Sequence, residues 1–116
     1  MHELSILEGM IQGIQEEALS QGFGRVLQVR LEVGRLAGAD VEALRFAFEA
    51  VSQDTLAEGA LLEIIELPGK GVCRTCGREV EIEQRFDLCP VCGEGFVSVT
   101  GGTELRIKDI DVEGEG

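Results

Sequence analysis

The residues best suited to chemistry are the cysteines, which form two Cys-x-x-Cys pairs made of Cys73, Cys76, Cys89 and Cys92. The two-residue spacer lets both sulfurs of a pair reach one ion, so two pairs supply the four thiolates of a tetrahedral zinc site. Gly77 and Gly93 follow the pairs directly and allow a left-handed turn, so that amide N–H groups can point at the thiolates. Because four protein ligands leave no open coordination position, the predicted site is structural.

Other uses of these cysteines are possible. Iron in a rubredoxin-like site is held by the same spacing and is the main alternative to zinc. Two disulfides would suit a small secreted domain. A thioredoxin-like redox centre needs only one pair, near a βαβ pattern. The spacing and the expected compartment favour zinc.

A second group of potential metal donors lies at the start of the sequence. His2 is the only histidine of the chain. A free α-amine, the amide nitrogen of residue 2 and the Nδ1 of His2 can close two adjacent chelate rings, and Glu3 could add a fourth donor. Such a planar, nitrogen-rich array suits Ni(II) or Cu(II) better than zinc. Taken alone the signal is weak, because most histidines near a terminus bind nothing and an acidic Glu3 simply favours a helix N-terminus.

Composition limits the classes of partner. The chain has 116 residues and a formal net charge of −12, with no Trp or Tyr, so its core must be aliphatic. A strongly acidic chain is unsuited to a phosphate backbone, which argues against a nucleic-acid partner. No apolar run is long enough to span a membrane. The first residues lack the basic region and apolar core of a signal peptide, so a cytoplasmic location is expected.

Hydrophobic periodicity predicts the elements that would position these groups. Helical spacing relates the apolar residues Leu4, Leu7, Ile11, Ile14 and Ala18, and Ser5 with Glu8 suggests a capping box. Residues 26–33 alternate like a half-buried strand. Asp40 stands where an N-cap belongs, before a second amphipathic segment that contains Val41, Leu44, Ala47, Phe48 and Val51. Residues 61–67 and 104–112 are predicted strands, and residues 95–99 could return a strand of the cysteine segment.

This order predicts an α+β fold with a small three-stranded sheet and two helices, plus an inserted zinc-ribbon-like module. A sheet this small needs its third strand, which only the C-terminal segment can supply. The predicted domains are therefore a split α+β domain, residues 1–68 and 97–116, and a zinc module, residues 69–96.

Several of these features together resemble the HypA/HybF family of hydrogenase nickel-incorporation proteins. The features are the Met1-His2-Glu3-Leu4-Ser5 start, the strand ending in Val-Gly, the segment from Asp40 to Glu49 and the two cysteine pairs. The resemblance covers essentially the whole chain in order. The Met-His-Glu start combined with the two cysteine pairs is specific, whereas either alone would not be.

The resemblance implies a nickel metallochaperone for [NiFe]-hydrogenase maturation. It implies that Ni(II) is transient cargo held by Met1, His2 and Glu3, with Asp40 as a further ligand or only a helix cap. It also implies structural Zn(II) on the four cysteines. The implied partners are a GTPase that also handles nickel and the hydrogenase large subunit.

No nucleophile–base pair is evident, so we expect no catalysis. The sequence is also compatible with two other classes of protein. One is a zinc-ribbon protein-interaction module without a nickel function. The other is a rubredoxin-like electron carrier. Supply of urease or another nickel enzyme is also left open.

Overall fold

The structure is a computed structural model that describes residues 3–113. Its first helix, α1 (Glu3–Gln21), buries the predicted apolar stripe of Leu7, Ile11, Ile14 and Ala18. The helix begins at Glu3, so Ser5 lies inside it and the predicted capping box is wrong. Gly22 ends the helix with a positive φ of 87° and donates its N–H to the Ala18 carbonyl at 2.8 Å.

The second helix, α2 (Val41–Ser52), begins at the predicted cap. Asp40 has extended backbone angles, and its Oδ1 accepts the amides of Glu42 and Ala43 at 2.9 and 3.2 Å. The buried residues of the helix include Leu44, Ala47 and Phe48, as the amphipathic pattern predicts. α2 packs against α1.

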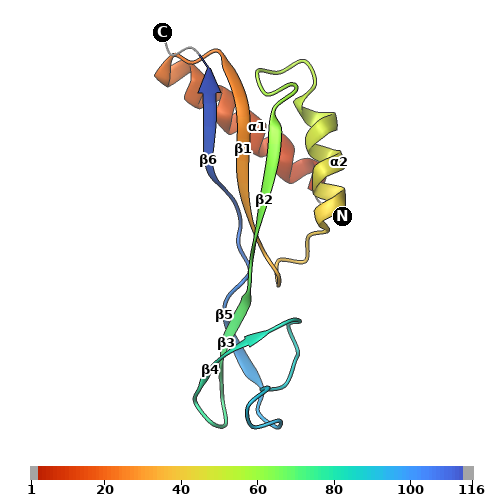
Figure 1. Cartoon of the computed structure of the whole chain (residues 1–116), viewed down its shortest axis with the longest axis vertical. Coiled ribbons are helices and arrows are strands. Elements are labelled where there is room, and N and C mark those ends of the chain that lie inside the picture. The colour runs from red at the N-terminus through yellow and green to blue at the C-terminus, as the bar shows by residue number, and fades with distance from the viewer. Residues whose placement is uncertain (1–2, 114–116) are drawn as a thin grey trace. The chain divides into compact units, whose positions relative to one another are not determined.

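Three strands form the sheet that the helices cover, β1 (Arg25–Gly34), β2 (Leu61–Leu67) and β6 (Leu105–Glu113), in the order β2-β1-β6. α1 runs across one face of this sheet (Figure 1). Val29, Leu31 and Val33 of β1 are buried, whereas Arg30 and Glu32 between them are half-buried. The predicted α+β class, with two helices and a three-stranded sheet, is therefore confirmed.

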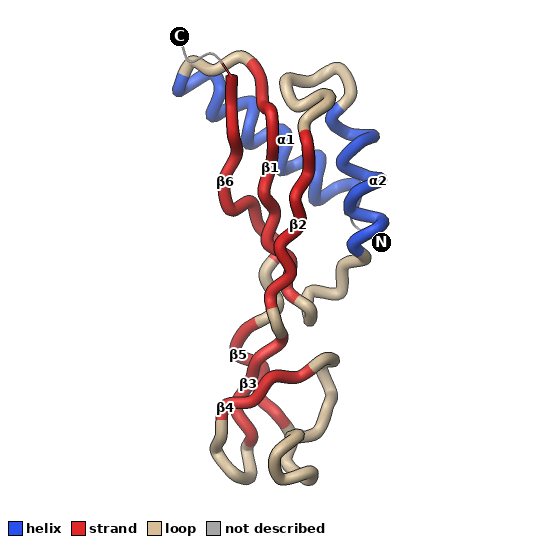
Figure 2. The backbone as a smooth tube through the Cα atoms, viewed as in Figure 1, coloured by secondary structure: helices blue, strands red, loops and turns tan. Residues whose placement is uncertain are grey.

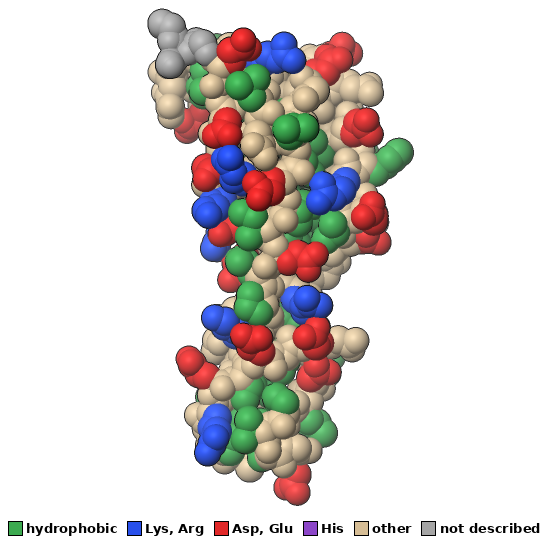
Figure 3. Space-filling model, in the orientation of Figure 1, with side chains coloured by type: hydrophobic (Ala, Val, Ile, Leu, Met, Phe, Trp, Pro, Cys, Tyr) green, Lys and Arg blue, Asp and Glu red, His purple; other side chains and the backbone are tan. Residues whose placement is uncertain are grey.

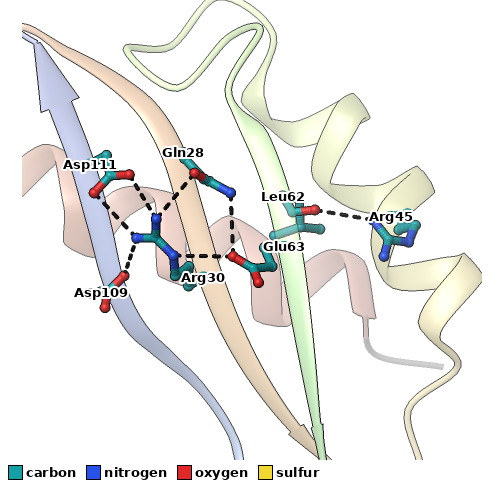
Figure 4. A network of polar contacts seen from close by, with 7 residues as sticks. All are labelled: Gln28, Arg30, Arg45, Leu62, Glu63, Asp109 and Asp111. Atoms are coloured by element: carbon teal, nitrogen blue, oxygen red, sulfur yellow. Dashed lines mark hydrogen bonds and ion pairs between the residues drawn. The ribbon is translucent and has the colours of Figure 1, made fainter.

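The opposite face of the sheet carries a polar network centred on Arg30 (Figure 4). Its guanidinium bonds Asp109 at 2.7 Å, Asp111 at 3.0 Å and Glu63 at 3.2 Å. The hydrogen bonds to Asp111 and Asp109 raise the pKa of Arg30 above its ordinary value. Acidic and basic side chains accordingly lie side by side over β1 and β6 (Figure 3). Since these residues come from all three strands, the network favours one strand register.

A second sheet, formed by β3 (Gly69–Cys73), β4 (Glu79–Ile82) and β5 (Val97–Gly101), carries the cysteines. Its order is β4-β3-β5, and β3 is antiparallel to both neighbours. Its small core is built from Leu36, Val80, Ile82, Cys73 and Cys89. The sequence prediction anticipated β5 but missed β3, which starts directly after Pro68. Figure 2 shows how little regular structure the cysteine segment contains apart from these strands.

The contacts divide the chain into two compact units. The first unit comprises residues up to 31, residues 39–64 and residues from 107 onward, and the second unit comprises residues 32–38 and 65–106. The sequence-based domain limits, residues 1–68 with 97–116 and residues 69–96, stay a prediction. They differ from the contact division in assigning residues 32–38, 65–68 and 97–106 to the domain of the helices.

Neither helix within residues 3–113 is both long and apolar enough to cross a membrane.

Candidate metal centre

The second unit brings the four predicted cysteine ligands, Cys73, Cys76, Cys89 and Cys92, into one cluster. All four Sγ atoms lie within 4.8 Å of one another. The Sγ atoms of Cys73 and Cys92 are 3.7 Å apart, and those of Cys76 and Cys89 are 3.8 Å apart. A tetrahedral ion with metal–sulfur bonds of about 2.3 Å separates its sulfurs by about 3.8 Å. None of the four forms a disulfide. The sulfur positions therefore fit a single tetrahedral metal ion.

Each cysteine pair is shaped by the backbone that follows its first member. The amides of Thr75 and Cys76 both donate to the Cys73 Sγ at 3.3 Å. In the second pair, the amides of Val91 and Cys92 donate to the Cys89 Sγ at 3.3 and 3.4 Å. N–H groups directed at a sulfur favour its thiolate form, which is the form that binds metal.

The glycines after the pairs close these turns. Gly77 and Gly93 have φ angles of 76° and 77°, as the sequence predicts. Their own amides do not bond sulfur: they donate to the carbonyls of Cys73 and Cys89 at 2.9 and 2.8 Å. The prediction is thus confirmed for the left-handed turn. The amides that hold the thiolates come from the two residues before each glycine.

These contacts spread the cysteine pKa values apart. The amide of Cys76, and then that of Thr75, lowers the pKa of Cys73 to about 6. The amides of Cys92 and Val91 also lower the pKa of Cys89. For Cys76, the Arg78 amide acts to lower the pKa, but burial and the neighbouring sulfurs of Cys73 and Cys89 outweigh it and raise the pKa to about 11. The amide N–H groups therefore favour the thiolate form of the first cysteine of each pair.

Sequence reasoning missed Gly95, although it shapes the cluster. A Cβ at Gly95 would overlap the Sγ of Cys73 and would lie 2.9 Å from the Cβ of Thr75. The Gly95 carbonyl accepts the Cys89 amide at 2.9 Å, which ties this residue to the second pair as well. The only sequence signal was a second glycine two residues after Gly93. The two pairs can approach each other only because residue 95 has no side chain.

Of the predicted nickel donors, the structure places two. Met1 and His2 lie outside the described residues. The Glu3 Oε2 accepts the backbone amide of Asp40 at 3.2 Å, so the first turn of α1 meets the N-terminus of α2. Asp40 uses Oδ1 to cap α2. The structure thus brings Glu3 and Asp40 together, as a shared site would require, and assigns Asp40 at least the role of helix cap.

The cap role of Asp40 can be separated from a ligand role by two substitutions. Asp40→Ala removes the oxygen that accepts the Glu42 and Ala43 amides, so we expect a loss of about 1 kcal/mol in the free energy of unfolding. Asp40→Asn keeps a capping oxygen and should change stability little. Urea denaturation of both variants checks this prediction. An equal loss in the two variants would contradict the cap role.

Fold and site together define a class: a small α+β protein in which a ribbon-like unit with a four-cysteine cluster accompanies a three-stranded sheet and two helices. Comparison with known proteins makes this class specific. Residues 1–112 match the sequence profile of the family described as hydrogenase/urease nickel incorporation, metallochaperone, HypA. The chain belongs to the HypA family.

Curated relatives agree with this assignment. Hydrogenase maturation factor HypA of Alkalilimnicola ehrlichii is 52% identical over 113 residues, covering 97% of this chain and 100% of the relative. That of Rhodobacter capsulatus is 54% identical over 112 residues, covering 97% and 99%. The solution structure of the nickel metallochaperone HypA from Helicobacter pylori has the same fold, with a TM-score of 0.68 at 23% identity and 97% coverage of both chains. A second solution structure of a HypA protein gives a TM-score of 0.70 at 22% identity, covering 97% of this chain and 96% of the other.

Proposed function

We propose that this chain carries Ni(II) as cargo at Met1, His2 and Glu3 and delivers it for maturation of [NiFe]-hydrogenase. The observation that carries the proposal is family membership over residues 1–112, combined with the Met-His-Glu start. The contact between the Glu3 carboxylate and the Asp40 amide supports it, because it draws both acidic candidates to one place in the first unit. Asp40 would then serve as a ligand in addition to capping α2.

The proposed donors suit loading and release. The terminal amine, the amide nitrogen of residue 2 and the imidazole of His2 form a nitrogen-rich set that matches the planar preference of Ni(II). The imidazole must be neutral and the amide deprotonated, so affinity falls on acidification. A site built on the first residues of a chain can exchange ligands with a partner, whereas a closed cage would retain its ion.

In this proposal the cysteine cluster binds a second metal, Zn(II). Zn(II) on the four cysteines keeps the second unit folded, and no catalytic step is assigned to it. The proposed partners are a nickel-handling GTPase and the hydrogenase large subunit, met in the cytoplasm. Nucleic acid has no part in the proposal. Urease supply is not part of it either, although the family description includes urease.

Nickel titration of an untagged protein tests the proposal. By calorimetry at neutral pH, His2→Ala should weaken Ni(II) binding at least about a hundredfold, because it removes the imidazole donor. Each tenfold change in affinity corresponds to about 1.4 kcal/mol. Glu8→Gln is the matched control, because it removes an exposed carboxylate of the same helix and should leave affinity unchanged. An added N-terminal residue, which displaces the amine from position 1 but keeps the imidazole, should also weaken binding.

Other outcomes have clear meanings. Nickel affinity that survives in His2→Ala would contradict the delivery proposal and favour an interaction module. In the same titration, weaker binding by Asp40→Asn would make Asp40 a ligand as well as a cap. Metal analysis that finds iron instead of zinc, with the visible absorption of ferric thiolate, would favour an electron carrier.

A further inference from the structure

The free edge of the first sheet borders a groove that the nickel proposal does not use. Within the described residues, β6 and β2 are the two edge strands of the order β2-β1-β6. On the β2 edge, the Leu62 carbonyl accepts a hydrogen bond from the Arg45 guanidinium at 3.1 Å (Figure 4). On the β6 side, α1 passes behind the strand and ends beyond it (Figures 1 and 2). A groove of about 700 Å³ lies there, between helix and strand.

The groove is mostly apolar and has an open floor. Its apolar lining includes Ile110 and Val112 of β6 and Met10 and Ile14 of α1, and the charged residues Glu17, Lys108 and Asp109 border it as well. Gly13 also lines it, and a Cβ at this position would meet no atom within 4 Å. A glycine inside a helix costs about 1 kcal/mol relative to alanine, so helix formation does not account for it. The floor at Gly13 has room for a side chain from another molecule.

An added strand fits this geometry better than a globular surface. An edge strand leaves every second N–H and C=O unpaired, and an extended peptide can pair with them. Asp109 and Asp111 both bond Arg30 on the face turned away from α1. Ile110 and Val112, which line the groove, alternate with them. A paired strand would therefore place alternate side chains in the groove and the others beside Asp109 and Asp111.

A second copy of the chain is a poor occupant. If the β6 strands of two copies paired symmetrically and antiparallel, with both α1 helices on the same side, one residue of β6 would lie opposite its own copy. If that residue were Lys108, Asp109 or Asp111, identical charges would face each other. If it were Ile110, Asp109 of one copy would face Asp111 of the other. Like charges directly opposite each other are destabilising, and two chains of net charge −12 repel each other.

We infer that the groove between α1 and β6 binds an extended segment of a partner protein, in which apolar residues alternate with Lys or Arg. Main-chain pairing with β6 supplies hydrogen bonds. The apolar residues enter the groove over Gly13, and the basic residues stand opposite Asp109 and Asp111. The partner needs no metal for this contact, which is independent of the proposed nickel site.

A short synthetic peptide of alternating valine and lysine is the probe, with a peptide of alternating valine and glutamate for comparison. Titration of full-length protein, followed by amide NMR shifts, should place the valine–lysine peptide on β6 and the adjoining face of α1. Gly13→Leu fills the floor and should weaken binding at least about tenfold, a loss of about 1.4 kcal/mol. Gly9→Leu is the matched control: Gly9 lies one turn earlier in α1, is equally open, and does not line the groove.

Both leucine variants should gain helix propensity alike, so equal thermal stability confirms that neither is misfolded. The inference is overturned if the valine–lysine peptide fails to bind, or if the valine–glutamate peptide binds as well. It is also overturned if both variants lose affinity equally. Dimerisation of the free protein that Gly13→Leu abolishes would replace the partner segment with a second copy.

Discussion

Replacing Cys89 with serine is expected to abolish binding of the proposed zinc ion and to unfold the second unit. The Cys89 side chain is almost fully buried, at 1% exposure, and its Sγ accepts the amides of Val91 and Cys92. Serine offers a neutral hydroxyl in place of a thiolate, and three remaining sulfurs make an incomplete tetrahedron. Cys89 also belongs to the small core of this unit, so the substitution removes a ligand and a packing partner together.

The expected effect is large because the hydrophobic core of this unit is small. Apart from the cysteines, its buried core consists of Leu36, Val80 and Ile82, with the partly buried Val97 and Val99 packed against it. Structural zinc sites contribute apparent binding free energies of about 10–16 kcal/mol at neutral pH in small peptides. A core of three aliphatic side chains cannot replace a contribution of that size. Removing the metal with a chelator should therefore have the same result as the substitution.

Metal analysis and amide NMR spectra measure both effects. The native chain should hold one zinc ion, and Cys89→Ser should hold much less, with the signals of residues 65–106 collapsing into the range of unfolded peptides. Val91→Ser is the matched control, because it changes an exposed residue of the same turn, which is not a ligand. A metal-free Cys89→Ser protein that kept dispersed signals for the second unit would show that packing alone folds it.

The parts of this structure that could be predicted are those fixed by local chemistry. Cysteine spacing specified the cluster, because two residues between ligands leave few other arrangements. Asp40 was predicted as the cap of α2 from its type and from the apolar pattern that follows it, and the structure confirms it. Strongly periodic segments gave both helices and the strands β1, β2 and β6. The first turn of α1 was misplaced because Ser5 and Glu8 match a capping pattern that also occurs inside helices.

The rest depends on contacts between segments distant in sequence. β3 carries little periodic signal, since its sequence is Gly-Lys-Gly-Val-Cys and its partners are β4 and β5. Gly95 matters because the first cysteine pair is folded against it and because its carbonyl accepts the Cys89 amide. The assignment of Met1 and His2 as nickel donors stays a prediction. Their chemistry can be inferred from the sequence, but both lie outside the described residues. The contact between Glu3 and Asp40 depends on the packing of two helices, and no local pattern encodes that packing.

Gly34→Ala is expected to destabilise the protein by at least about 3 kcal/mol, because the added methyl group would have to occupy the place of a peptide group. A Cβ at Gly34 would overlap the carbonyl of Gly102. Gly102 is itself in a crowded position, because a Cβ there would overlap Gly69 and the Pro68 carbonyl, and its φ is 93°. The obstacle is backbone, so no rotamer change can relieve it.

Hydrogen bonds in the second unit hold these chain segments together and make the overlap costly. The Gly34 amide donates to the Glu104 carbonyl at 2.7 Å, and the Leu36 amide donates to the Gly102 carbonyl at 2.7 Å. Moving residue 34 far enough to admit a methyl group would stretch both bonds, and each such bond contributes about 1 kcal/mol. The strain and the lost bonds therefore act in the same direction.

Gly24→Ala supplies the control, since Gly24 directly precedes β1 as Gly34 ends it, and a Cβ there would meet no atom within 4 Å. Replacing it should leave the free energy of unfolding unchanged or raise it by up to about 1 kcal/mol, through the reduced entropy of the unfolded chain. Urea denaturation of the zinc-loaded proteins compares the two variants. If Gly34→Ala unfolds at the same urea concentration as Gly24→Ala, the close approach of Gly34 to Gly102 is not a requirement of the fold.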